Sequence, residues 1–274
     1  MTPPPAEPFV AELRASAEEA ARLAGRILAE RFGGRRTVEF KGGIDLVTDA
    51  DRASEAALVA FLRGRYPNHA ILAEESGLSQ APGDLRWLVD PLDGTTNYAH
   101  RVPHFCVSVA VEGPQGLLAG AVYDPLRGEL FSAARGQGAH LDGRPIAVSE
   151  ASSLERALVC TGFPYDVRER PELPVGLFDR IIRKVQGVRR LGSAALDLAY
   201  VACGRFDGFF EVGLKPWDIA AGALLVAEAK GVVTRLDGAP LDLASGQVLA
   251  GGPALHRALQ LECAAVIAEV AVRD

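Results

Sequence analysis

The sequence contains few cysteines, no long apolar run and no excess of basic residues, and each of these absences excludes a class of protein. The four cysteines are Cys106, Cys160, Cys203 and Cys263. They stand far apart and form no C-x-x-C pair, which excludes a zinc ribbon or a disulfide framework and favours reduced thiols in a core. The apolar stretch 219–227 is far shorter than the ~18 residues of a membrane span. We therefore expect no association with membranes.

The charge balance disfavours a nucleic-acid partner. Lys and Arg number 29 against 35 Asp and Glu, which gives a formal net charge of −6, whereas domains that bind nucleic acid through bulk electrostatics are basic. At first sight the same sum also disfavours anionic ligands. The first residues lack a basic segment followed by an apolar run, so a cytoplasmic location is expected.

The composition that is present is that of a globular protein, with 274 residues, 49% hydrophobic and 23% charged. Apolar residues at helical spacing predict a helix over 9–31 and a second one that begins near Thr48, where Thr48 and Asp51 fit a capping box. Short apolar runs then predict several strands. We expect residues 1–150 to form helices and a sheet rich in antiparallel strands, with most of the candidate metal ligands. Residues 151–274 are expected to form an α/β half with the substrate wall and one further ligand, joined across a soft boundary into one compact unit.

The most informative stretch is WLVDPLDGTTN at 87–97. Asp90 and Asp93 stand three residues apart after an apolar strand, so their carboxylates can converge on a hard cation, while the N–H groups of Gly94 and Thr95 can face an anion. The proline after Asp90 is expected to end the strand there. This arrangement suits metal-assisted phosphoryl transfer, although a D-G turn with a solvated Asp90 would give the same letters.

Three further acidic groups accompany this stretch. Glu74 and Glu75 follow the apolar run 71–73, and adjacent acids repel each other unless they are solvated or share a cation. The segment DLVTDAD at 45–51 places acids in the first turn of a helix, where they also suit the helix dipole whatever the function. Asp218 opens a long apolar helix, and a carboxylate buried there needs a partner.

Together these motifs resemble those of the inositol monophosphatase family of phosphatases. The resemblance is carried by WLVDPLDGTTNY at 87–98 and WDIAAG at 217–222, and DLVTDAD at 45–51, AEESG at 73–77 and LGSAALDLA at 191–199 extend it over nearly the whole chain. It implies a layered α-β-α-β-α sandwich of the inositol monophosphatase and fructose-1,6-bisphosphatase type. It also implies two to three Mg²⁺ ions, a small phosphorylated polyol or sugar as substrate, sensitivity to lithium and a homodimer.

The resemblance further implies roles for individual residues. The implied metal ligands are Glu74, Glu75, Asp90, the carbonyl of Leu92, Asp93 and Asp218. The implied substrate-binding residues are Lys41, Asp93, Gly94, Thr95, Gly192, Ser193, Ala194 and Glu211. Since Mg²⁺ both activates water and neutralises a leaving oxygen, we expect direct in-line attack by an activated water. Thr95, with Asp51 or Glu74 behind it, is expected to orient and deprotonate that water.

Several substrates and one other class of function remain open at this point. Inositol 1-phosphate leads, because a carboxylate such as Glu211 accepts hydrogen bonds from vicinal hydroxyls. Histidinol phosphate, fructose 1,6-bisphosphate and nucleotide 3′-phosphates remain alternatives, and segment 161–165 differs from animal members of the family. The other class is a partner-binding regulatory protein with a vestigial site, which the intact ligand set disfavours.

The remaining reactive side chains offer no covalent mechanism. Cys106 is expected in the middle of an apolar strand, and neither His100 nor His104 has an evident acidic partner in the sequence. The apolar strands around 105–133 could supply a dimer interface, although strand composition alone does not distinguish an interface from a core.

Overall fold

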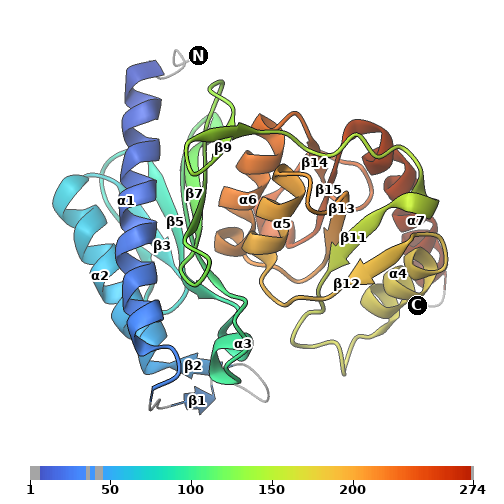
Figure 1. Cartoon of the computed structure of the whole chain (residues 1–274), viewed down its shortest axis with the longest axis horizontal. Helices are drawn as coiled ribbons and strands as arrows, with labels where there is room; N and C mark the ends of the chain where they lie inside the picture. The colour runs from blue at the N-terminus through green and yellow to red at the C-terminus, as the bar shows by residue number, and fades with distance from the viewer. Residues whose placement is uncertain (1–6, 35–37, 41–45, 273–274) are drawn as a thin grey trace.

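The computed structural model describes residues 7–34, 38–40 and 46–272. The chain forms two large β-sheets with helices outside and between them, in five layers ordered α-β-α-β-α (Figure 1). This arrangement confirms the predicted fold class. None of the helices in the described part of the chain combines the length and the apolar composition needed to cross a bilayer.

The first outer layer and the first sheet come from the first half of the chain. Helices α1 (Glu7–Arg31) and α2 (Asp49–Arg65) cover one face of an eight-stranded sheet. In spatial order its strands are β10 (Arg144–Ile146), β9 (Ala139–Leu141), β8 (Glu129–Ala134), β7 (Gly116–Asp124), β6 (Cys106–Gly113), β5 (Arg86–Asp93), β3 (Ala70–Ala73) and β4 (Gly77–Ser79). Only β3 and β5 pair in parallel. A short antiparallel pair, β1 (Val38–Phe40) and β2 (Leu46–Thr48), precedes α2.

The middle helices and the second sheet come from the second half. Helices α5 (Ala194–Ala202) and α6 (Pro216–Glu228) lie between the sheets (Figure 1). The second sheet has the order β12 (Gly187–Arg189), β11 (Leu158–Thr161), β13 (Gly208–Glu211), β15 (Val248–Gly251) and β14 (Val232–Thr234). Helices α4 (Glu172–Ile182) and α7 (Pro253–Ala271) cover its outer face. The short helix α3 is Thr95–Ala99, and single 3₁₀ turns span Leu154–Arg156 and Leu243–Ser245.

The apolar strands between residues 105 and 133 belong to the core of the chain. Along β6, Val107, Val109 and Val111 pack in the cluster that contains α1, whereas Cys106 and Ala110 pack in the cluster that contains α5 and α6. Because successive residues of a strand point to opposite faces, this alternation buries both faces of the sheet within one chain. These side chains are therefore core residues of one chain, and a dimer interface in the region 105–133 stays a prediction.

Strand β5 runs further than the sequence predicts. It continues through Pro91 to Asp93, and its pairing with β6 shifts register between Asp90 and Asp93. A bulge accommodates the missing N–H of proline and lets the strand resume. The Ser54 hydroxyl, from α2, donates a hydrogen bond to the Pro91 carbonyl at 3.0 Å and fixes this irregularity. The expected end of the strand at Asp90 is thus corrected, and Asp90 and Asp93 flank a bulge.

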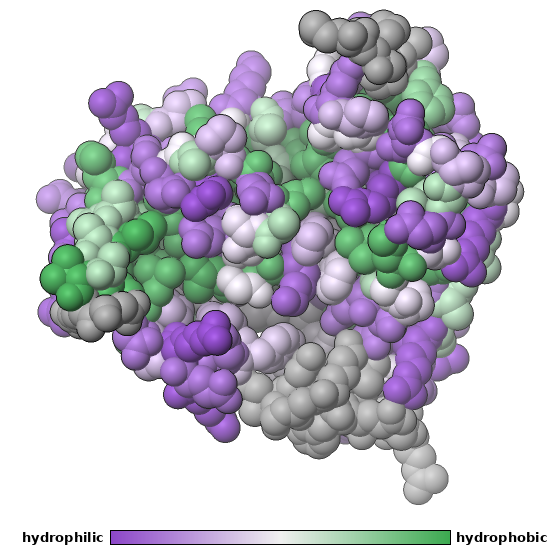
Figure 2. Space-filling model, turned by 180° about the vertical axis from the view of Figure 1, so that it is seen from behind, coloured by the Kyte–Doolittle hydropathy of each residue, from purple (hydrophilic) through white to green (hydrophobic). Residues whose placement is uncertain are grey.

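Apolar and polar residues are mixed on the surface. On the face opposite to that of Figure 1, apolar residues gather at the left, on the side of the molecule where α4 and α7 lie, with hydrophilic residues between them (Figure 2). Exposed apolar residues on these two helices are Val175, Ile182 and Leu261. Single apolar side chains on a surface are ordinary, because a folded chain has too little polar surface to cover itself.

Candidate active site

A cavity of about 290 Å³ lies where the end of β5 and α3 face the N-termini of α5 and α6 and the end of β13. Most of the residues singled out in the sequence line it: Glu74, Asp90, Leu92, Asp93, Gly94, Thr95, Gly192, Ser193, Ala194, Glu211 and Asp218. The fold therefore brings together residues up to 144 positions apart, from Glu74 to Asp218.

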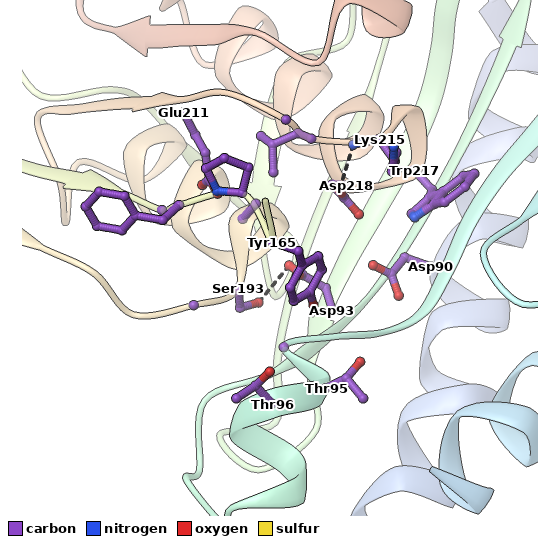
Figure 3. Close-up of a pocket in the computed structure, with 18 of the residues that line it drawn as sticks. Asp90, Asp93, Thr95, Thr96, Tyr165, Ser193, Glu211, Lys215, Trp217 and Asp218 are labelled. Atoms are coloured by element: carbon purple, nitrogen blue, oxygen red, sulfur yellow. Dashed lines mark hydrogen bonds between the residues drawn. The ribbon is translucent and has the colours of Figure 1, made fainter. Parts of the chain in front are cut away.

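Asp90 and Asp218 approach each other from opposite sides of this cavity. Asp90 is 2% exposed, and its Oδ1 accepts a hydrogen bond from the Leu92 N–H at 2.9 Å. The Oδ2 of Asp218 accepts from the Lys215 N–H at 2.7 Å, at the start of α6. The two carboxylates point toward one space in Figure 3. Burial, and then the charges of neighbouring acids, raise the pKa of both carboxyls well above the usual range.

Asp93 is held by the first turn of α5. Its Oδ2 accepts a hydrogen bond from the Ser193 hydroxyl (Figure 3) and another from the Ala195 N–H, both at 2.7 Å. The Cys106 thiol lies 3.6 Å from the same oxygen. Burial raises the pKa of Asp93, and the two hydrogen bonds partly oppose this effect. Because one oxygen is occupied, the other remains to face the cavity.

Thr95 and Asp51 form a buried pair beside the carboxylates. The Thr95 hydroxyl lies 3.2 Å from Asp51 Oδ1 and 3.0 Å from the Leu92 carbonyl. Asp51 also accepts from the Thr48 N–H and hydroxyl, and the Thr48 hydroxyl oxygen accepts from the Asp51 N–H at 3.4 Å. This reciprocal bonding is the predicted capping box of α2. Burial raises the pKa of Asp51 to about 6. Asp51 therefore changes charge just below neutral pH.

The turn that carries Glu74 and Glu75 is held by a residue that the sequence did not single out. Glu55 of α2 is 5% exposed, and its carboxylate accepts hydrogen bonds from the N–H groups of Glu75 and Ser76 at 2.8 and 2.9 Å. Glu74 lines the cavity. The charge of Glu75 raises the pKa of Asp51, so Glu75 faces the same region.

The backbone at Gly94 requires glycine. Its φ of +99° lies in the left-handed region, and a Cβ would come within 3.1 to 3.3 Å of His104, Phe105 and Gly192. A side chain here would be strained by the positive φ, and these neighbours would also have to move by a few tenths of an ångström. At Gly94, the end of β5 thereby packs directly against the loop before α5.

The carboxylate of Glu211 forms the opposite wall. Glu211 ends β13 and is 9% exposed, and burial raises its pKa well above the usual range. A Cβ on Gly162 would lie 2.1 Å from Glu211 Oε1, so this carboxylate packs directly on the backbone of the segment 161–165. The charge of Arg190 partly opposes the rise in the pKa of Glu211.

The donor set of this cavity fits a hard divalent cation. Buried carboxylates that raise one another's pKa need positive charge among them, and carboxylate and carbonyl oxygens are the ligands that Mg²⁺ prefers. Among the described residues, no three acidic, His or Cys side chains already converge as a closed metal site. The carboxylates of Asp90 and Asp218, which point toward one space, are the donors around which such a cation would bind (Figure 3).

Comparisons with known proteins identify the family. The model of the inositol monophosphatase family matches residues 10–270. The chain belongs to this family. It is 45% identical over 246 residues to Nus factor SuhB of Escherichia coli K12, across 89% of this chain and 92% of that protein. It is 46% identical over 251 residues to inositol-1-monophosphatase of Synechocystis, across 91% and 88%.

Solved structures of this family have the same fold. The extragenic suppressor protein suhB from Bartonella henselae superposes with a TM-score of 0.87 at 38% identity, across 91% of this chain and 97% of that one. Inositol monophosphatase from Anabaena gives a TM-score of 0.85 at 43% identity, across 93% and 96%. Members of the family are phosphatases that act on small phosphorylated substrates, generally with Mg²⁺.

The structure adds residues to the site that the sequence did not assign to it. Arg190, Lys215 and Trp217 also line the cavity. Lys215 and Trp217 come shortly before Asp218 in the sequence, and this proximity is the signal that could have pointed to them. No local feature of the sequence marks Arg190. Lys41 lies outside the described residues.

Two statements about reactive side chains are corrected. Cys106 begins β6 and contacts Asp93, instead of lying in mid-strand. His104 has an acidic partner, because its Nε2 lies 3.7 Å from Asp197 Oδ1. The sequence does not predict this pair, because its two residues are 93 positions apart.

Proposed function

We propose that this protein is a Mg²⁺-dependent phosphomonoester hydrolase with inositol 1-phosphate as its preferred substrate. The observation that carries the proposal is the arrangement of the cavity, with carboxylates and the Gly94–Thr95 backbone on one side and Glu211 on the other. The relative named inositol-1-monophosphatase supports the substrate.

The residues proposed to hold Mg²⁺ are Glu74, Asp90, the carbonyl of Leu92, Asp93 and Asp218, with Glu75 near a further ion. When bound, Mg²⁺ neutralises the phosphate and the leaving oxygen and makes water a stronger nucleophile. The oxygen of Asp93 that is free of α5, and that of Asp218 free of Lys215, are the ones we assign to this role.

Thr95 and Asp51 are proposed to handle the proton of the attacking water. The Thr95 hydroxyl can accept from water while it donates to Asp51 Oδ1, which lies 3.2 Å away. With a pKa of about 6, Asp51 is largely ionised at neutral pH and is a fitting acceptor. The oxygen–phosphorus bond of the water then forms as the ester bond breaks, in line and without a phosphorylated enzyme. Glu74 is the alternative acceptor.

Glu211 is proposed to bind the alcohol part of the substrate with Gly192, Ser193 and Ala194. A carboxylate accepts hydrogen bonds from neighbouring hydroxyls of a polyol. Its position on the backbone of segment 161–165 explains why that segment contributes to the wall. Lys41 is proposed to approach the phosphate.

The experiment that tests the proposal is a panel of phosphomonoesters assayed for phosphate release with Mg²⁺. Inositol 1-phosphate should give the highest kcat/KM, ahead of histidinol phosphate, fructose 1,6-bisphosphate and a nucleotide 3′-phosphate. A clear preference for any of the other three would change the proposed substrate but leave the proposed phosphatase activity in place. LiCl, with NaCl as control, should inhibit, as the family resemblance implies.

A second candidate function is that of a partner-binding protein, and the name Nus factor SuhB among the relatives favours it. Complete absence of phosphate release in millimolar Mg²⁺ would make it the leading one. A homodimer and a cytoplasmic location remain proposals, and equilibrium sedimentation tests the dimer.

A further inference from the structure

One buried carboxylate of the described chain has no role in the proposed reaction. Asp197 is 1% exposed and lies on α5, whose other eight residues are uncharged and buried. Its Oδ1 has no hydrogen-bond partner. The His104 Nε2, 3.7 Å away, also lacks one, and His104 is 8% exposed. The 3.7 Å between these two atoms is too long for a hydrogen bond and is a close polar contact.

A buried carboxylate in an apolar helix is costly, and packing alone does not require it. An uncharged residue of similar volume would fill the same space, as its neighbours on α5 do. The neighbours of Asp197 indicate what it supports. Its charge raises the pKa of Asp93 and of Glu211, and its carboxylate also interacts with the Cys160 thiol of β11.

The position of α5 decides where Asp93 lies. Two atoms of the first turn of this helix, Ser193 Oγ and the Ala195 N–H, hold Asp93 Oδ2 at 2.7 Å. Asp197 is in the same turn, because its N–H donates to the Ser193 carbonyl at 2.9 Å. Any shift of this turn therefore moves the Asp93 carboxylate.

His104 lies in the segment after α3, which faces the loop before α5. Its carbonyl accepts a hydrogen bond from Asn97 Nδ2 at 2.8 Å, and that amide also donates to the Leu191 carbonyl at 2.7 Å. Asn97 thus ties the segment after α3 to the loop before α5. The contact between His104 and Asp197 is a second tie between the same two segments.

We propose that His104 and Asp197 are positioning residues, which hold the start of α5 against the segment after Gly94 and so fix Asp93 for cation binding and turnover. This inference rests on the proposed function, since turnover is measured as phosphate release. Neither residue lines the cavity. Their effect reaches the cavity through Ser193 and Ala195, and a misplacement of about 1 Å at a reacting centre can cost about 100-fold in rate.

The test compares Asp197→Asn, His104→Phe and the double variant with the wild type. Each single variant should lower kcat about 10- to 100-fold with little change in KM, and the double variant should be no worse than the worse single one. The rise in the unfolding midpoint that MgCl₂ produces should be smaller in each variant. This second readout does not depend on turnover, so it tests the pair even if the wild type releases no phosphate, an outcome that would refute only the proposed function.

The matched control is Asp124→Asn. Asp124 is also 1% exposed and carries one cationic partner, Arg127, at 2.9 Å, but it does not line the cavity. It should lower the unfolding midpoint while kcat and the response to MgCl₂ stay as in the wild type. If Asp197→Asn behaves like this control, the pair is merely structural and the proposal is overturned.

If His104→Phe does not fold, a variant with two conservative substitutions provides the test instead. The double variant H104Q/D197N places two amides where a neutral hydrogen bond can replace the contact between His104 and Asp197. Partial recovery of kcat relative to Asp197→Asn alone supports a positioning contact. A further fall in kcat would contradict it, because the two amides would then have restored the contact without restoring any activity.

Discussion

At the scale of single residues, the site is a set of carboxylates, and in each of them one oxygen accepts hydrogen bonds from the protein. Asp90 accepts from a backbone N–H of its own bulge, Asp93 from the start of α5 and Asp218 from the start of α6. This division orients each carboxylate before any ligand binds, and it leaves the second oxygen for a cation. The net charge of −6 therefore gives no guide to the ligand, because positive ions bound among these acids would make the cavity locally attractive to phosphate.

Replacing Asp93 by Asn should abolish turnover and keep the fold. The amide retains the volume and one acceptor oxygen for Ser193 and Ala195, but it removes the negative charge that a cation requires. We expect kcat to fall by at least about 100-fold, measured as phosphate release. Circular dichroism and the unfolding midpoint should stay near wild type. Asp142→Asn, in an exposed turn, is the control, and full turnover of Asp93→Asn would disprove the metal assignment.

Replacing Thr95 by Val tests the proton path. Valine has the same shape but no hydroxyl to donate to Asp51 Oδ1, so a water could no longer be deprotonated through this position. We expect a fall in kcat of about 10²- to 10⁴-fold. Thr95→Ser keeps the hydroxyl and should retain most of the activity. Equal rates for the two variants would remove Thr95 from the mechanism.

At the scale of elements, the sequence predicts features whose residues lie close together along the chain. It does not predict those that depend on contacts between distant segments. The capping box of Thr48 and Asp51 was predicted, because both partners lie within one turn. The bulge after Asp90 was missed, because its register depends on pairing with β6. The support of Glu55 to the turn of Glu74 was also missed, since a single acid on a helix gives no sign of what it faces.

The close approach at Gly94 can be measured against a second glycine. Gly94 and Gly128 both have positive φ, +99° and +70°, but only Gly94 has atoms within 4 Å of the position of a Cβ. Gly128→Ala should lose about 1 kcal/mol of unfolding free energy from backbone strain alone. Gly94→Ala should lose clearly more, because His104, Phe105 and Gly192 must also move. Urea denaturation measures both, and equal losses would show that the contacts at Gly94 are unimportant.

At the scale of the whole molecule, the buried acids make stability depend on pH and on cations together. The pKa of Asp51, about 6, exceeds its usual 3.8, so the folded chain holds this proton more tightly than the unfolded chain does. The resulting stabilisation is complete below pH 3.8 and is lost as the pH rises through 6. It amounts to about 3 kcal/mol. Asp90, Asp218 and Glu211, with raised pKa values, act in the same direction.

The metal-free protein should therefore become less stable between pH 5 and pH 8. Glu129 and Glu262, whose pKa values are lowered, lose their stabilising charge only at more acidic pH and do not mask the effect. Mg²⁺ should raise the unfolding midpoint more at pH 8 than at pH 5, because its ligands must be deprotonated to bind it. Thermal unfolding in EDTA and in MgCl₂ measures both trends, and Asp51→Asn should flatten the decline in EDTA. A midpoint that rises with pH in EDTA would mean that the carboxylates are already compensated without a cation, and the electrostatic basis of the proposed metal site would be lost.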